Sequence, residues 1–70
     1  MTKKIELSFC TCTFTHDEKR QILFIDMMKK GKMIYQTQIS QSTRKFVNQL
    51  INTFDDKEAK DIYSLQMEVI

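Results

Sequence analysis

The sequence of this 70-residue chain contains no proline, no tryptophan and a single glycine. Flexible linkers and low-complexity tracts depend on glycine and proline, so the composition excludes both and predicts one small domain over residues 1–70. Two cysteines allow at most one intramolecular disulfide, which excludes a disulfide-rich scaffold. A domain of this size buries only about 60% of its unfolded surface, so its stability margin is narrow.

Long apolar runs are also missing. The run that matters most, Ile22–Ile25, stops at Asp26 and is far too short to cross a bilayer. Near the start of the chain, Glu6 and the polar residues after it interrupt the apolar segment that a signal peptide needs. We therefore expect a cytoplasmic protein whose cysteines stay reduced and which has no membrane partner.

Charge is weak but unevenly distributed, with a net value of +2 at pH 7. Residues 1–45 hold nine Lys or Arg against four Asp or Glu, whereas residues 46–70 hold two against five. A basic first half suits a phosphate backbone or an acidic protein surface. The excess is nevertheless smaller than that of a dedicated nucleic-acid-binding domain.

Residues 4–15 predict one long strand, because apolar and polar side chains alternate and three threonines favour extended backbone. The apolar residues change parity halfway along: Ile5, Leu7 and Phe9, then Cys10, Cys12 and Phe14. One extra residue near Phe9 and Cys10, a β-bulge, would bring both sets onto one face. Without a bulge, both faces of this strand must be partly covered.

Two further strands follow a polar turn. Residues 21–28 are apolar on both faces, which predicts a central strand, and residues 32–39 alternate as a third strand. Between them Gly31 can adopt a positive φ at no steric cost, so the segment Lys29–Lys32 predicts a hairpin turn.

A helix is the clearest element. The hydroxyls of Ser40 and Ser42 offer an N-cap, and one apolar stripe follows at helical spacing: Phe46, Val47, Leu50, Ile51 and Phe54. Asp55 and Asp56 oppose the dipole of a helix C-terminus, so the helix should end near them.

The tail allows two interpretations. Strict alternation over residues 63–69 favours a strand, giving the order βββαβ. Asp55 as an N-cap with Glu58 as its partner favours a helix instead, with the order βββαα. The shared face of that helix would hold Ala59, Ile62, Tyr63, Met67 and Ile70. We predict the first alternative, an α+β fold with a three-stranded antiparallel meander, one amphipathic helix packed on the sheet, and a C-terminal strand.

Both cysteines and the only histidine fall within seven positions, from Cys10 to His16. The common zinc knuckles separate their cysteines by two to four residues and use four ligands, which this segment does not supply. Alternate residues of a strand are also too far apart for a disulfide. We expect two buried thiols, with no metal site and no cofactor. We expect His16 and Asp17 in an exposed turn that offers no catalytic base, so we expect no enzymatic activity.

Two groups of basic residues are candidates for binding nucleic acid. Lys29, Lys30 and Lys32 form the hairpin tip, and Arg44 and Lys45 begin the helix. Spacing of four residues places Arg44, Asn48 and Asn52 on one polar ridge, and Arg and Asn suit the base edges of guanine and adenine. A nucleic-acid-binding regulator built on these residues is the alternative prediction.

A protein-binding surface is the leading prediction. One helix covers only one face of a sheet, so the strand over residues 21–28 needs something on its other face: a partner, a second copy or the tail. Five methionines also suit an adaptable interface, and tyrosines are common anchors. The residues that we predict to contact a partner are Lys29, Lys30, Lys32, Tyr35, Arg44, Lys45 and Asn48.

In size, lack of cofactor motifs and uneven charge, the chain is similar to the small inhibitors made by phages and mobile elements, such as anti-CRISPR and other anti-defence proteins. The similarity is one of general character and rests on no motif. It implies a non-enzymatic inhibitor that binds a host defence or nucleic-acid-handling complex, with a homodimer as a further alternative.

Overall fold

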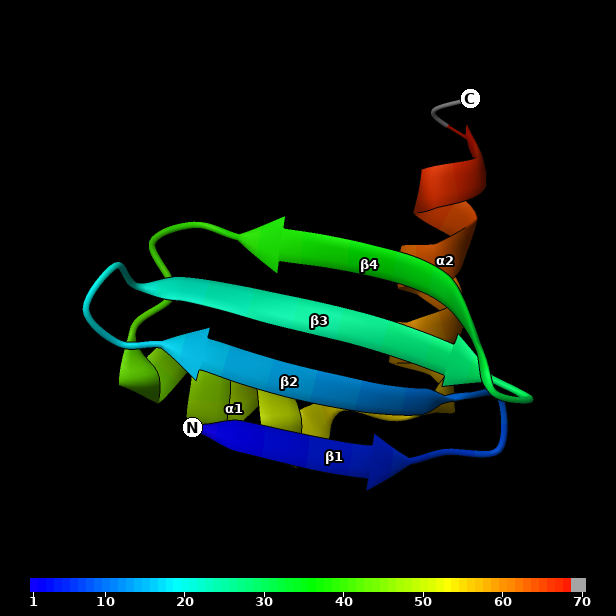
Figure 1. Ribbon diagram of the computed structural model, residues 1–70, viewed down its shortest axis with the longest axis horizontal. Helices are drawn as coiled ribbons and strands as arrows, with labels where there is room; N and C mark the ends of the chain where they lie inside the picture. Colours follow the sequence, from blue (N-terminus) through cyan, green and yellow to red (C-terminus); the bar gives the residue numbers. More distant parts are fainter. Residues whose placement is uncertain (69–70) are drawn as a thin grey trace.

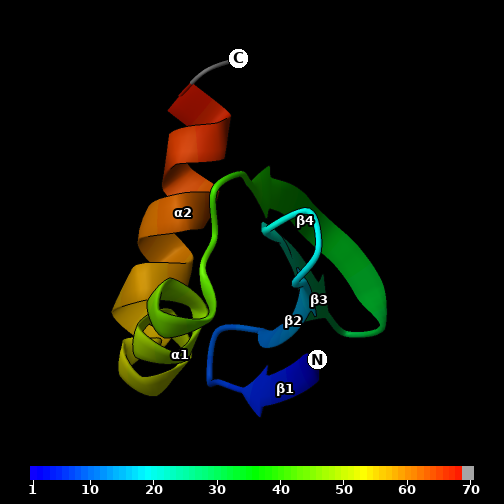
Figure 2. The ribbon, with the colours of Figure 1, turned by 90° about the vertical axis from the view of Figure 1, so that its left-hand side faces the viewer.

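The structure of the protein is a computed structural model that describes residues 1–68, with side chains described for residues 1–65. Its antiparallel sheet has four strands in chain order: β1 (Thr2–Glu6), β2 (Thr11–Asp17), β3 (Ile22–Lys29) and β4 (Lys32–Ile39) (Figure 1). Two helices follow: α1 (Arg44–Thr53) and α2 (Asp56–Glu68). Both lie on one side of the sheet (Figure 2). The class is α+β, but the predicted order βββαβ is wrong, because the described order is ββββαα.

The long strand predicted over residues 4–15 is wrong because the chain reverses direction within it. β1 and β2 pair with Ile5 opposite Cys12, and the amide of Leu7 donates to the carbonyl of Cys10 at 2.9 Å across the turn. The change of parity near Phe9 therefore marks a turn and not the predicted bulge. A reversal also brings both apolar sets onto one face, and this turn has no glycine or proline to reveal it.

The predicted C-terminal strand is also wrong, since α2 runs through it. The carboxylate of Asp55 accepts from the amide of Glu58 at 2.9 Å, which is the capping bond of the alternative interpretation. Ala59 is buried, and Ile62 and Tyr63 pack against the core. This cap and this burial outweigh the alternation of residues 63–69. The side chain of Met67 and all of Ile70 lie outside the described residues.

The hairpin between β3 and β4 forms as predicted. Lys30 and Gly31 both have positive φ, 52° and 75°, which suits a two-residue turn between twisted strands. β4 covers residues 32–39 as expected, although a register shift between Met27 and Met28 leaves Ile34 unpaired within it. The cap of α1 is Thr43, one residue beyond the predicted hydroxyls, and its Oγ1 accepts from the amide of Phe46 at 3.2 Å.

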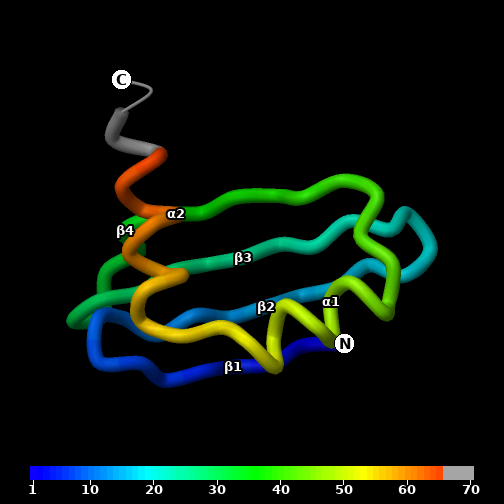
Figure 3. Tube along the Cα trace, turned by 180° about the vertical axis from the view of Figure 1, so that it is seen from behind, coloured from blue at the N-terminus to red at the C-terminus, as the bar shows by residue number. Residues whose placement is uncertain are grey.

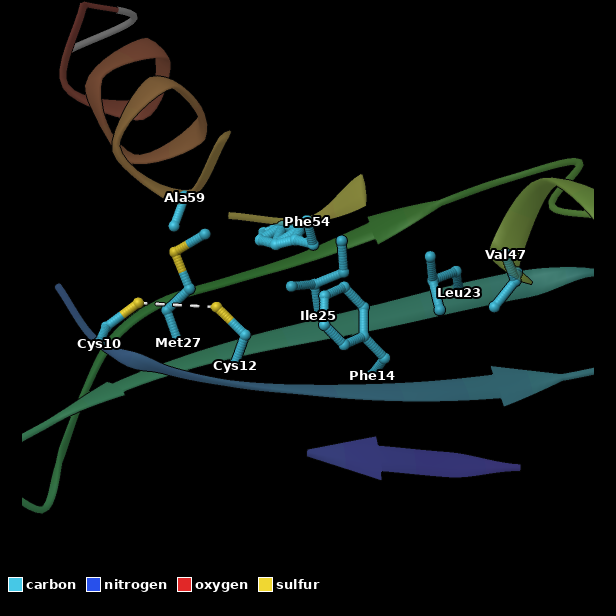
Figure 4. Close-up of a cluster of buried hydrophobic side chains, with 9 residues drawn as sticks. All are labelled: Cys10, Cys12, Phe14, Leu23, Ile25, Met27, Val47, Phe54 and Ala59. Atoms are coloured by element: carbon cyan, nitrogen blue, oxygen red, sulfur yellow. Dashed lines mark hydrogen bonds between the residues drawn. The ribbon is translucent and has the colours of Figure 1, made fainter. Parts of the chain in front are cut away.

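The core lies between the sheet and the helices, which stand in front of the sheet in Figure 3. Its buried apolar side chains come from β2, β3, α1, α2 and their connections (Figure 4): Cys10, Cys12, Phe14, Leu23, Ile25, Met27, Val47, Phe54 and Ala59. The rings of Phe14 and Phe54 meet edge to face, with centroids 4.9 Å apart. The helices therefore cover a continuous apolar surface of the two central strands.

His16 lies at the end of β2 and is buried, so the predicted exposed turn is wrong at this residue. Its Nε2 donates to the carbonyl of Ser42 at 2.7 Å, because a carbonyl can only accept. The amide of Ser42 donates to Gln21, and its hydroxyl donates to Ile39. These bonds tie the β4–α1 connection to the end of the sheet.

Candidate interaction surface

The sheet has a second face, which points away from both helices. Strand alternation assigns to it the residues that alternate along each strand with those of the covered face: Thr2, Lys4 and Glu6 of β1; Thr11, Thr13, Thr15 and Asp17 of β2; Ile22, Phe24, Asp26 and Met28 of β3; Met33, Gln36 and Gln38 of β4. We call this set the open face. On β2 and β3 these residues are all partly exposed, whereas their neighbours on the covered face are buried, except at the exposed end of β3.

Apolar side chains gather on the β3 and β4 part of the open face. Phe24 and Met28 of β3 are half-buried, and Met33, opposite Met28, is 52% exposed. A face that only met water would carry polar residues at these positions. β3 is therefore apolar on both sides, as its sequence predicts, and its outer side chains are available to a partner.

Polar side chains cross the centre of the open face in one row. Strand pairing places Lys4 opposite Thr13, Thr13 opposite Asp26, and Asp26 opposite Gln36. Oδ1 of Asp26 is shielded from solvent and has no hydrogen-bond partner among the described residues. A shielded carboxylate oxygen without a partner costs free energy, so this position of the open face is unfavourable for folding alone.

A hollow of about 370 Å³ lies beside this row, at the end of the sheet where β3 turns into β4. Its lining combines two ammonium groups with two hydroxyls and a thioether: Lys4, Thr11, Thr13, Met28, Lys30 and Gly31. Such a lining suits an acidic group of a partner.

The predicted basic residues do not form one patch. Lys29, Lys30 and Lys32 lie at the β3–β4 turn, whereas α1 begins near the β2–β3 turn, at the opposite end of the sheet (Figure 1). Nζ of Lys29 stands 4.8 Å from the ring centre of Phe9, on the helix side. Of the three lysines, Lys30 lines the hollow of the open face.

The predicted residues of the helix lie away from the open face. Nε of Arg44 donates to Oε1 of Glu18 at 2.6 Å, and this bond lowers the pKa of Glu18. Lys45 and Asn48 are exposed on α1. Tyr35 is opposite Met27 on the covered face and packs against the core. Of the residues predicted to contact a partner, Lys30 alone lines the hollow, and the central row is not predicted because it depends on β1 being a separate strand.

The apolar stripe predicted for the helix is wrong at Phe46. Val47 and Phe54 are buried, but Phe46 is 40% exposed and borders a shallow hollow of about 500 Å³ along α1. The remaining residues of its lining are Gln49, Leu50, Asn52 and Thr53. This hollow offers a single exposed aromatic ring and no charged side chain.

The two cysteines form a contact inside the core, with 3.6 Å between their sulfurs and no disulfide (Figure 4). Burial, which is the largest cause, together with the hydrogen bond and charge of Cys10 and the charge of Asp56, raises the pKa of the Cys12 thiol to about 12. A neutral buried thiol is a poor nucleophile. The part of the chain that the structure describes contains no group of three or more His, Cys, Asp or Glu that could hold a metal ion.

Within residues 1–68, no helix has both the length and the apolar character needed to cross a membrane. No family model, curated protein sequence or solved structure matches this chain. The open face combines an apolar strand, a polar central row and a hollow, and is the candidate interaction surface.

Proposed function

We propose that this domain is a non-enzymatic, cytoplasmic binding protein that uses the open face to dock on another protein. The observation that carries the proposal is the apolar surface of the half-buried Phe24 and Met28 and the exposed Met33, in the same face as a polar row with Asp26 at its centre. Apolar side chains with a few polar groups among them are the usual composition of a protein interface.

Charge favours a protein over nucleic acid as the partner. The open face itself carries one lysine, Lys4, against the three acidic residues Glu6, Asp17 and Asp26. A surface that follows phosphates needs a net positive charge. The lysines of the hairpin lie at one end of this face, and Arg44, at the other end of the sheet, is paired with Glu18.

The chemical state of the nucleophiles supports a role in binding. Nε2 of His16 is engaged with a backbone carbonyl at 2.7 Å, and the Cys12 thiol is neutral at physiological pH because of its raised pKa. A general base and a nucleophile need hydrogen-bond reach of a substrate, and both groups are buried.

Within this proposal, the partner belongs to a host defence or nucleic-acid-handling complex, and the domain acts as an inhibitor in the manner of small phage proteins. Small size and uneven charge support this setting. Lys30 and Lys32 then form a basic rim that speeds association with an acidic surface.

The test is a pull-down from host lysate, with and without nuclease, using wild type and two matched variants. Met33→Glu introduces a charge on the open face, and Phe46→Glu introduces the same charge on α1, also at an exposed apolar residue. We expect one protein to be retained by wild type and by Phe46→Glu after nuclease treatment, and to be lost with Met33→Glu. Loss of all captured species on nuclease treatment, or loss only with Phe46→Glu, would overturn the proposal.

A further inference from the structure

The central row of the open face has opposite charges at equal distances from β2. Lys4 on β1 and Asp26 on β3 are both opposite Thr13, and neighbouring strands are about 4.8 Å apart. The two side chains therefore start about 10 Å apart with a threonine between them. Within one chain each charge lies two strands from the other, and Oδ1 of Asp26 lacks a partner among the described residues.

A two-fold axis parallel to β2 makes this row complementary to itself. When two open faces meet across such an axis, each row of one copy lies over the same row of the other. β1 of each copy then lies over β3 of the other. Lys4 of each copy then lies over Asp26 of the other. A two-fold axis along the row, at right angles to the strands, would place Lys4 over Lys4, so the charges select the first orientation.

We propose that the open face docks on a second copy of this chain in this orientation, forming a two-fold dimer with two Lys4–Asp26 ion pairs. The inference goes beyond the proposed function: the dimer uses the β1, β2 and β3 part of the open face, so self-association competes there with the docking of another protein. Each pair gives the Asp26 carboxylate a cationic neighbour, whereas Lys4 of its own chain lies two strands away.

The rest of the open face is consistent with this arrangement. Thr11, Thr13 and Thr15 lie along the axis, where small side chains let two sheets approach to about 10 Å. Glu6 shares a row with Thr11 and Met28, so Glu6 of the second copy lies over Met28.

Met28 lines the hollow together with Lys4 and Lys30, which places an acidic side chain of the second copy beside two ammonium groups. The third acid of the open face, Asp17, already accepts from Nε of Arg20 at 2.8 Å. Every acidic residue of the open face then has a cationic neighbour.

The facing area is small. Only β1, β2 and β3 overlap, a width of about 14 Å, and β4 extends beyond the contact. An interface of this size is smaller than those of standard stable complexes, which bury about 1,200–2,000 Å² in total. We therefore expect a weak, reversible dimer, populated at concentrations of about 10 to 100 µM and above.

The first test is sedimentation velocity from about 5 to about 500 µM, a range that brackets such a dimer. We expect wild type to shift from monomer to dimer. Lys4→Glu and Asp26→Lys each place two like-charged pairs across the axis, so each should weaken self-association at least about tenfold. An equimolar mixture of the two variants should associate again, because both pairs are then between opposite charges. The matched controls Lys57→Glu and Asp61→Lys, at exposed positions of α2, should self-associate as wild type does.

A second test does not depend on a charge reversal in the sheet. Thr13→Cys places a thiol on the axis and should give a disulfide-linked dimer on mild oxidation, while Gln36→Cys, in the same row but off the axis, should not. Wild type that stays monomeric over the whole range, a mixture that does not associate, or equal cross-linking at both positions would overturn the inference. In that case, a pull-down still abolished by Met33→Glu leaves the proposed function standing.

Discussion

The two faces of the sheet carry different side chains, and the difference is larger on β2 than on β3. On the covered face both strands present buried apolar side chains, such as Phe14 and Ile25, which are opposite one another. On the open face β2 presents threonines and an aspartate, as a solvated strand should, whereas β3 presents Ile22, Phe24 and Met28. On the outer side of β3 there are more apolar side chains than a solvated strand needs for folding, and this excess indicates a binding surface.

The largest test of this contrast compares Phe14→Ala with Phe24→Ala. The two phenylalanines lie on neighbouring strands and on opposite faces. Phe14 is fully buried against Phe54, so its loss leaves a cavity and should lower the free energy of unfolding by about 3–5 kcal/mol. Phe24 is half-buried, so Phe24→Ala should lower the free energy of unfolding of the monomer by about 1 kcal/mol. Urea unfolding at a concentration below that of any self-association measures both, and equal losses would mean that the open face is part of the folding core.

A smaller effect is expected on the covered face, where Cys12 makes the stability of the fold depend on pH. The raised pKa of Cys12 means that the folded protein keeps the thiol proton above the ordinary pKa of 9.0, while the unfolded chain loses it. Stability from this group is therefore complete below pH 9 and is lost as the pH rises toward 12, at no more than about 1.4 kcal/mol per pH unit.

Cys12→Val removes this thiol while keeping an apolar side chain of similar size. We expect the stability of this variant to fall less steeply than that of wild type between pH 9 and pH 10.5, in parallel urea titrations. Identical slopes would show that the Cys12 thiol does not titrate differently in the folded state. Lysines and tyrosines titrate in both proteins, so the difference between the slopes isolates the thiol.

The smallest expected effect is on the open face. A side-chain hydrogen bond from Arg20 lowers the pKa of Asp17, so any stability from this carboxylate is present above its ordinary pKa of 3.8 and is lost as the pH falls through the lowered value. Both residues are at the surface, so Arg20→Gln should change the acid unfolding midpoint only slightly. A large shift, measured by circular dichroism on acid titration, would mean that this end of the open face contributes to folding as much as the core does.

The sequence predicts those parts of the fold that depend on neighbours along the chain. The hairpin at Gly31, the extent of β4 and the end of α1 follow from local backbone preference and capping. The turn between β1 and β2 is not predicted because it is made of Leu7, Ser8, Phe9 and Cys10, of which only Ser8 is typical of turns.

The central row of the open face could not be predicted for the same reason. Lys4 meets Thr13 only when β1 is a separate strand, so its alignment with Asp26 is a property of register and not of spacing. The two-sided character of β3, by contrast, is visible in the sequence. This two-sided pattern indicates that β3 has an exposed apolar side, but it does not show which charged residues lie beside it.

The order of the strands in the sheet, which is the order of the strands in the chain, has a kinetic consequence. Each strand pairs with the one made just before it, and the β3–β4 turn needs only two residues, so sheet formation requires little loop closure. Contacts between sequence neighbours favour rapid folding. The whole sheet precedes α1 and α2 in the chain, so it leaves the ribosome before the segment that will shield one of its sides. During synthesis both sides of the sheet are therefore briefly uncovered, and the packing of the helices then shields the more apolar side.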